Sequence, residues 1–129
     1  MNQNVVTTAY KQALNKTFAN AFNGIQQFFK TERNGKIQAA VALFIILIGF
    51  YFRLSSVEWI LTLVCIGSVI GLEMLNSAIE HLCNLVHNNY HPAIKIIKDM
   101  AAGAVLFAAV ISVIIGLIIF IPKVLFLLL

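Results

Sequence analysis

The chain has 129 residues, of which 60% are hydrophobic and only 11% are charged. These proportions exclude the surface of an ordinary soluble protein and indicate an integral membrane protein. The net charge of +4 does not indicate nucleic-acid binding, because the nine lysines and arginines are scattered around apolar segments and form no dense basic run with interleaved aromatic residues.

The first part of the chain, residues 1–36, has the pattern of an amphipathic helix followed by a polar hinge at residues 31–36. Between residues 10 and 30 the apolar side chains recur at helical spacing. The segment is too polar to cross a membrane, so we expect it to lie along the membrane interface with its phenylalanines in the acyl boundary. Packing within a helix bundle fits the pattern equally well. The apolar positions are Leu14, Phe18, Ala21, Phe22, Ile25, Phe28 and Phe29, and Lys11, Lys16 and Lys30 are among the polar ones.

Three apolar segments follow, and each predicts a transmembrane helix. The first apolar run, from Ile37 to about Phe52, is short for a span of about 20 residues unless its polar start is included. The whole chain, 1–129, is therefore expected to be a single all-α domain, a bundle of three transmembrane helices. The predicted spans are 37–56, 57–80 and 99–122.

The distribution of basic residues predicts the orientation of these spans. Cytoplasmic segments carry an excess of lysine and arginine, so the richer side is placed in the cytoplasm, together with the N-terminus. Segment 81–98 is then a cytoplasmic connection, in which Pro92 breaks any continuous helix. One side carries Lys11, Lys16, Lys30, Arg33, Lys36, Lys95 and Lys98, and the other carries Arg53 and Lys123.

Small residues along the third span indicate that copies of the chain associate. A bundle of three helices is too small to shield many polar groups, and small side chains permit the close approach of membrane helices. We therefore expect a homo-oligomer. The small residues are Gly103, Ala104, Ala108, Ala109, Ser112 and Gly116.

A stripe of polar side chains marks the cytoplasmic end of the second span. On a helix that advances about 100° per residue, Glu73, Asn76, Ser77, Glu80 and Asn84 project from one stripe about 100° wide. Carboxylates near hydrocarbon are costly and indicate a function, and oxygen ligands of this kind suit Mg²⁺ together with substrate phosphates.

The depth of each carboxylate suggests its role. Glu80 lies near the interface, as a metal ligand would, whereas Glu73 lies two turns deeper, where partial desolvation favours proton acceptance from a hydroxyl group. Lys98 could neutralise phosphate oxygens, and Asp99 beside it could orient that lysine or join the metal shell. Glu32 approaches from the hinge before the first span.

Three motifs resemble those of the bacterial diacylglycerol kinase and undecaprenol kinase family of small membrane lipid kinases. They are Glu73-x-x-Asn76-Ser77-Ala78-Ile79-Glu80, then Asn89-Tyr90-His91-Pro92, and then Lys98-Asp99 followed by Met-Ala-Ala-Gly-Ala-Val-Leu. The resemblance implies a homotrimer in the bacterial inner membrane whose active sites are shared between subunits at the cytoplasmic interface. It also implies ATP- and Mg²⁺-dependent phosphorylation of the primary hydroxyl of a membrane lipid, either undecaprenol or diacylglycerol.

The resemblance also implies roles for individual residues. Glu73 would be the catalytic base, and Glu32 and Glu80 would bind the Mg²⁺ that accompanies ATP. Asn76, Glu80, Asn84, Lys98 and Asp99 would contact ATP, and Glu73, Asn76 and Lys98 would contact the lipid. Asn84 departs from the family pattern, which usually has aspartate there, and Gln38 stands where an ionisable residue is expected. His91-Pro92 and the Ala-Ala-Gly run are closer to the undecaprenol kinase branch.

Other functions remain open at this point. Paired glutamates on a membrane helix also serve as coupling sites in channels and proton-coupled carriers, or form hydrogen bonds between helices. A family member that binds nucleotide or lipid but has lost turnover through Asn84 is a further alternative. Zinc binding by Cys83, His87 and His91, with His81 nearby, is disfavoured, because Pro92 and the asparagines interrupt the helix on which these side chains would converge.

Overall fold

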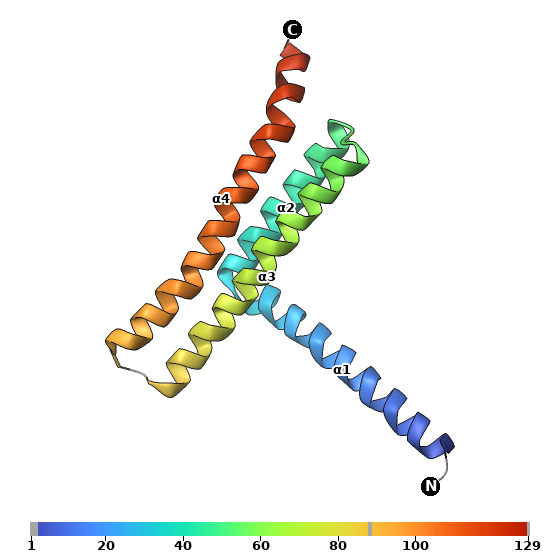
Figure 1. Ribbon diagram of the computed structural model, residues 1–129, viewed down its shortest axis with the longest axis vertical. Coiled ribbons are helices and arrows are strands. Elements are labelled where there is room, and N and C mark those ends of the chain that lie inside the picture. Colours follow the sequence, from blue (N-terminus) through green and yellow to red (C-terminus); the bar gives the residue numbers. More distant parts are fainter. Residues whose placement is uncertain (1–2, 88, 129) are drawn as a thin grey trace.

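The chain folds into four helices in the part described by the computed structural model, which covers residues 3–87 and 89–128, with side chains from residue 14 onward (Figure 1). The side chain of Lys11 therefore lies outside the described residues. No strand occurs within these ranges, so the all-α prediction is confirmed. The helices are α1 (Gln3–Thr31), α2 (Arg33–Tyr51), α3 (Ser56–Val86) and α4 (Pro92–Leu128).

Helices α2, α3 and α4 are by length and composition apolar enough to cross a membrane, in agreement with the predicted number of spans, although their bounds differ from the predicted 37–56, 57–80 and 99–122. Their 19, 31 and 37 residues correspond to about 28, 46 and 55 Å, compared with about 30 Å of hydrocarbon in a bilayer. Helix α2 is therefore just long enough, whereas α3 and α4 extend well beyond the hydrocarbon. Most large apolar side chains are exposed, as expected of helices that face lipid or other protein chains.

The connection between α3 and α4 is much shorter than the predicted segment 81–98. Helix α3 continues to Val86, and α4 begins at Pro92, so only residues 87–91 separate the two helices. Proline is well tolerated in the first turn of a helix, because its missing N–H would have no partner there. His91 assists this start, since its Nδ1 accepts a hydrogen bond of 3.2 Å from the backbone N–H of Ala93.

The polar hinge predicted at residues 31–36 is reduced to one extended residue, Glu32 (φ −81°, ψ 125°). Helix α2 starts directly after it, at Arg33, so the polar start does belong to the first span. At this junction α1 leaves the bundle (Figure 1). The turn is held by the buried ring of Phe28, which lies on Gly35 so closely that an added Cβ would be 2.8 Å from Phe28 Cε1.

Replacing Gly35 by leucine is therefore expected to destabilise the junction. No leucine side chain fits beneath the ring, and overpacking of this kind costs about 1–3 kcal/mol. Thermal unfolding in detergent measures the loss, and the matched control is Gly24→Leu on α1, where an added Cβ meets nothing within 4 Å. The double variant Phe28→Ala/Gly35→Leu should recover much of the stability. Equal unfolding temperatures for Gly35→Leu and the parent would contradict the packing described.

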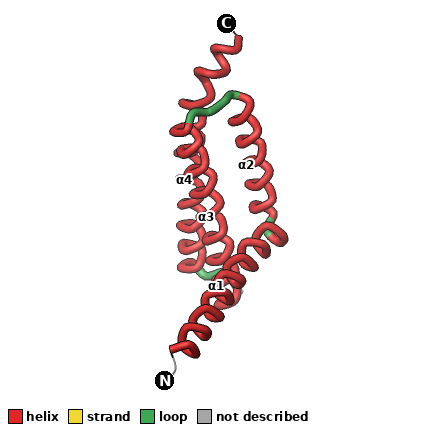
Figure 2. Tube along the Cα trace, turned by 90° about the vertical axis from the view of Figure 1, so that its right-hand side faces the viewer, coloured by secondary structure: helices red, strands yellow, loops and turns green. Residues whose placement is uncertain are grey.

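Helices α3 and α4 lie side by side, whereas α2 stands apart from them along much of its length (Figure 2). The turn between α2 and α3 connects these two helices at the end of the bundle opposite α1 (Figure 2). There, Ser55 and Glu58 form a reciprocal capping box at the start of α3. Lys123 Nζ of α4 lies 3.0 Å from Glu58 Oε1 and so ties α4 to the same end.

Candidate active site

Glu73 is the most buried charged residue in the described part of the chain. Its side chain faces the α1–α2 junction, and only 4% of the residue is exposed. Asn34 Nδ2, in the first turn of α2, donates a hydrogen bond of 2.7 Å to Glu73 Oε1. An amide donor partly compensates the desolvation of a carboxylate without neutralising it. The second carboxylate oxygen, Oε2, has no hydrogen-bond partner in the described part of the chain.

Glu32 reaches the same face of α3, about two turns further toward the α3–α4 connection. Its Oε1 lies 3.0 Å from His81 Nε2 and accepts a weaker hydrogen bond of 3.4 Å from Thr31 Oγ1. The side chain of Glu32 is 27% exposed and that of His81 is 69% exposed. The junction thus places two carboxylates, Glu32 and Glu73, along one side of α3.

A second polar group lies where α3 and α4 approach their connection. Lys98 Nζ of α4 donates a hydrogen bond of 2.7 Å to Asn84 Oδ1 of α3. This contact brings a lysine onto the predicted stripe, one turn from Glu80. Asp99 faces elsewhere and forms an ion pair with Lys95, one turn back on α4, and both side chains are 60% exposed.

Two further residues of the stripe, Glu80 and Asn76, form no polar contacts with other described residues. Glu80 is exposed and Asn76 is half-buried. No three His, Cys, Asp or Glu side chains among these residues are placed to hold a metal together. Glu80 directly precedes His81, the residue that Glu32 contacts, so the two carboxylates approach the same turn of α3. Two carboxylates suit Mg²⁺, which commonly takes one or two and completes its shell with water and phosphates.

The described chain does not bring all the predicted site residues together. Glu73 and Glu32 lie at the α1–α2 junction. Lys98 of α4 contacts α3 at Asn84, which follows Glu73 by eleven residues and therefore lies about 16 Å further along that helix. Neither Lys98 nor Asp99 contacts Glu73.

The sequence does not assign Asn34 or His81 to the candidate active site, although both contact its carboxylates. Asn34 appeared only as part of the hinge, because nothing in the pattern of α1 and α2 indicates that it faces Glu73. His81 lies about 80° around the helix from Glu73, at the edge of the polar stripe, and helical spacing could have added it. Its pairing with Glu32 depends on the fold.

The sequence was compared with those of characterised proteins. Residues 19–120 match the family of prokaryotic diacylglycerol kinases. Undecaprenol kinase of Bacillus subtilis is 47% identical over 108 residues, which cover 84% of this chain and 88% of that protein. Diacylglycerol kinase of Synechocystis is 36% identical over 101 residues, or 78% of this chain and 58% of that protein. Diacylglycerol kinase of Escherichia coli K12 is 25% identical over 108 residues, or 84% of this chain and 88% of that protein.

The match spans α2, α3 and most of α4, and it includes every residue placed in the site above. Over this length a likeness of 47% to an undecaprenol kinase also confirms the resemblance noted from the motifs alone. The chain therefore belongs to the prokaryotic diacylglycerol kinase family of membrane lipid kinases.

Proposed function

We propose that the protein transfers the γ-phosphoryl group of ATP, with Mg²⁺, to the primary hydroxyl of a membrane lipid, either undecaprenol or diacylglycerol. The observation that carries this proposal is the buried carboxylate of Glu73, oriented by Asn34 and with one oxygen left over. The similarity to an undecaprenol kinase makes that alcohol the first acceptor to test.

Glu73 would act as the general base. With Oε1 held by Asn34, Oε2 is available to accept the proton of the lipid hydroxyl as its oxygen attacks the γ-phosphorus. A hydroxyl group carried by a membrane lipid reaches the protein at the boundary between hydrocarbon and water. The α1–α2 junction, which Glu73 of α3 faces, would lie near that depth if α1 lies along the interface with Phe18 and Phe22, which are 72% and 67% exposed, in the acyl region.

Glu32 and Glu80 would hold the Mg²⁺, which supplies charge neutralisation for the phosphates. Binding would require Glu32 to exchange its contact with His81 for the metal, since a hard cation prefers carboxylate and phosphate oxygens. Phosphoryl transfer depends chiefly on positioning and on the neutralisation of charge. Lys98, Asn84, Asn76 and Asp99 would contribute to the binding of ATP from the cytoplasmic side.

Association of copies would bring further groups to each site. Glu73 and Lys98 are separated along α3 within one chain, so a neighbouring copy could supply the cation that faces Glu73. We propose a homotrimer in the bacterial inner membrane with the N-terminus in the cytoplasm. Chemical cross-linking in the membrane, or native mass spectrometry in detergent, tests the number of copies.

The direct test is phosphate transfer by the purified protein in mixed micelles. Labelled ATP, Mg²⁺ and either undecaprenol or diacylglycerol are supplied in parallel, and we expect labelled lipid with at least one acceptor. Transfer to neither lipid would overturn the proposal. ATP-independent ion flux through vesicles containing the protein would favour the channel or carrier alternative.

Replacing Asn84 by aspartate tests whether the asparagine has reduced turnover. Asn84 accepts a hydrogen bond from Lys98, so aspartate would convert this contact into an ion pair worth up to about 1 kcal/mol at an exposed site. We expect turnover to change by less than about fivefold, with Asn84 a tolerated variant of the family pattern. Initial rates at saturating ATP measure the effect. A large increase would instead support a chain that had lost turnover through this residue.

A further inference from the structure

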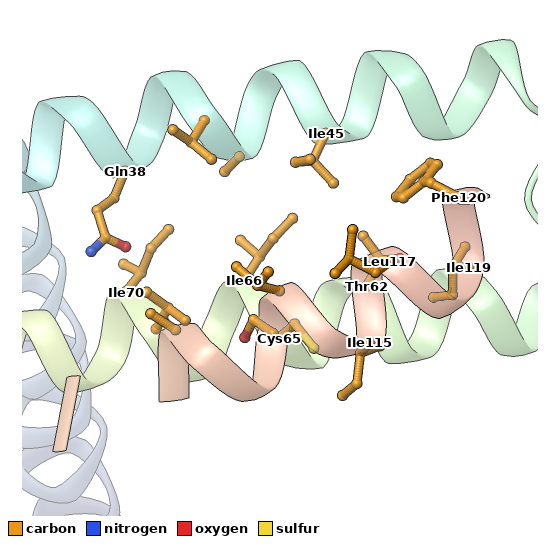
Figure 3. Close-up of a pocket in the computed structure, with 17 residues that line it drawn as sticks. Gln38, Ile45, Thr62, Cys65, Ile66, Ile70, Ile115, Leu117, Ile119 and Phe120 are labelled. Carbon is orange, nitrogen blue, oxygen red and sulfur yellow. The ribbon is translucent and has the colours of Figure 1, made fainter. Parts of the chain in front are cut away.

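A cavity of about 400 Å³ lies between α2, α3 and α4 (Figure 3). Gln38 stands at the end nearest the α1–α2 junction, and Phe120 and Thr62 stand toward the other end. The remaining lining is mostly aliphatic and includes Ile45 and Ile66. The cavity thus occupies the space between α2 and the α3–α4 pair.

The inner end of the cavity begins one helical turn from the candidate active site. Gln38 follows Asn34 by four residues on α2, and Ile70 precedes Glu73 by three residues on α3. Residues at these spacings share one face of a helix. The same two helix faces therefore hold the buried carboxylate and, next to it, the start of the cavity.

The interior of the cavity offers few hydrogen-bond donors. Thr62 Oγ1 donates to the carbonyl oxygen of Glu58 at 2.8 Å, and Ser112 Oγ donates to that of Ala108, also at 2.8 Å. Both hydroxyl protons are therefore used within their own helices. Gln38 has no such partner in the part of the chain that the structure describes. An occupant would thus meet one free amide at the inner end, the weakly donating thiol of Cys65 further along, and otherwise hydrocarbon.

We infer that this cavity holds the first part of the hydrocarbon tail of the acceptor lipid and that it favours an isoprenoid alcohol over diacylglycerol. This inference rests on the proposed function, because the hydroxyl would lie at Glu73. An isoprenoid alcohol has no polar group beyond its hydroxyl, whereas the ester carbonyls of diacylglycerol would find only the Gln38 amide and the weak Cys65 thiol as donors among the described lining residues. Buried acceptors without donors are disfavoured.

The tail gains little from the hydrophobic effect here, because it leaves one apolar medium for another. What the cavity provides is contact and orientation, which place the hydroxyl at the carboxylate. The lining extends over about 16 Å of α4, from Ala109 to Phe120. A long tail would therefore enter by its first part only and continue into the bilayer.

Photolabelling of the unmodified protein tests this placement without relying on turnover. The probe is an isoprenoid alcohol with a diazirine on the first part of its tail, applied in micelles and analysed by peptide mass spectrometry. We expect adducts at lining residues such as Ile45 and Ile66, and unlabelled undecaprenol should suppress them. Adducts confined to lipid-facing residues such as Leu47, which is 59% exposed, would overturn the inference.

A pair of variants on α2 tests the same point by activity. Ala42 lines the cavity, whereas Ala40 is exposed and lies outside it, so Ala42→Phe fills the cavity and Ala40→Phe is the matched control. We expect Ala42→Phe to lower kcat/KM for undecaprenol by about tenfold to a hundredfold, as a misplaced hydroxyl would. Ala40→Phe should stay within about twofold of the parent, and thermal unfolding checks both folds.

Gln38→Leu tests the choice between acceptors. Removing the amide donor should lower kcat/KM for diacylglycerol about fivefold more than that for undecaprenol, since one hydrogen bond is worth about that factor. Equal losses for both lipids would contradict the preference.

The outcomes separate this inference from the proposed function. If the parent protein phosphorylates neither lipid, the proposed function fails. If it phosphorylates a lipid but Ala42→Phe is as active as Ala40→Phe and the adducts lie outside the cavity, only the inference fails. Loss of the oligomer in Ala42→Phe alone, together with adducts outside the cavity, would assign this space to a contact between copies and would also overturn the inference.

Discussion

Glu73→Gln is expected to lower the rate of phosphate transfer by about 10²–10⁴-fold, the range that a general base typically contributes. Glutamine has nearly the same shape, and its side-chain carbonyl can still accept the hydrogen bond from Asn34 Nδ2. The substitution therefore removes the proton acceptor without disturbing the junction. Initial rates with undecaprenol measure the loss, and binding of a fluorescent ATP analogue should remain close to that of the parent.

The matched control for this variant is Glu58→Gln at the opposite end of α3. Glu58 caps the helix and pairs with Lys123, far along α3 from the candidate active site. We expect Glu58→Gln to lower the unfolding temperature slightly and to keep most of the activity. A Glu73→Gln enzyme that turned over at a near-parental rate would exclude Glu73 as the base, even if the protein remained a kinase.

Glu80→Gln is expected to act on Mg²⁺ and nucleotide binding instead. Loss of one carboxylate ligand should raise the Mg²⁺ concentration needed for half-maximal activity by at least about tenfold, a change of about 1.4 kcal/mol. Excess Mg²⁺ should restore part of the rate, because the remaining carboxylate and the ATP phosphates still bind the ion. Titration of activity with Mg²⁺ at fixed ATP measures the shift.

Glu32→Gln and the double variant decide whether the two carboxylates share one ion. Glu32 Oε1 lies 3.0 Å from His81 Nε2, and Glu80 is the residue before His81, so both carboxylates approach the same turn of α3 in the candidate site. Groups that act on one ligand are non-additive, and the double variant should therefore shift the Mg²⁺ requirement by less than the sum of the two single shifts. Full additivity would place the carboxylates at separate sites, and no shift in either variant would contradict the proposed ligands.

Hydropathy and spacing were sufficient to predict the class of fold, and they place the candidate site on α3. A run of apolar residues long enough to cross a bilayer is expected to be helical, because its backbone N–H and C=O groups must form their hydrogen bonds within the segment. Residues three, four and seven apart then share a face on any helix, so Glu73 and Glu80 lie on one stripe whatever the surroundings. Motif spacing also identified the family that the comparisons confirm.

Helix ends were less predictable than helix existence. Segment 81–98 is mostly helical although it is polar, because α3 and α4 support each other beyond the predicted spans and Pro92 falls in a first turn, where it does not interrupt a helix. The break before α2 likewise narrows to Glu32. Its position depends on the packing of Phe28 against Gly35, a contact between two helices that no periodicity reports.

What the sequence by itself determined is therefore the membrane-spanning helical class, the polar stripe of α3 and the family. The tertiary structure alone decided which groups meet across helices: Asn34 with Glu73, Glu32 with His81, and Lys98 with Asn84. It also produced the apolar cavity that begins at Gln38. The physical reason is that helical periodicity fixes neighbours along one helix, whereas partners on different helices depend on crossing angles and junction packing that arise only when the helices assemble.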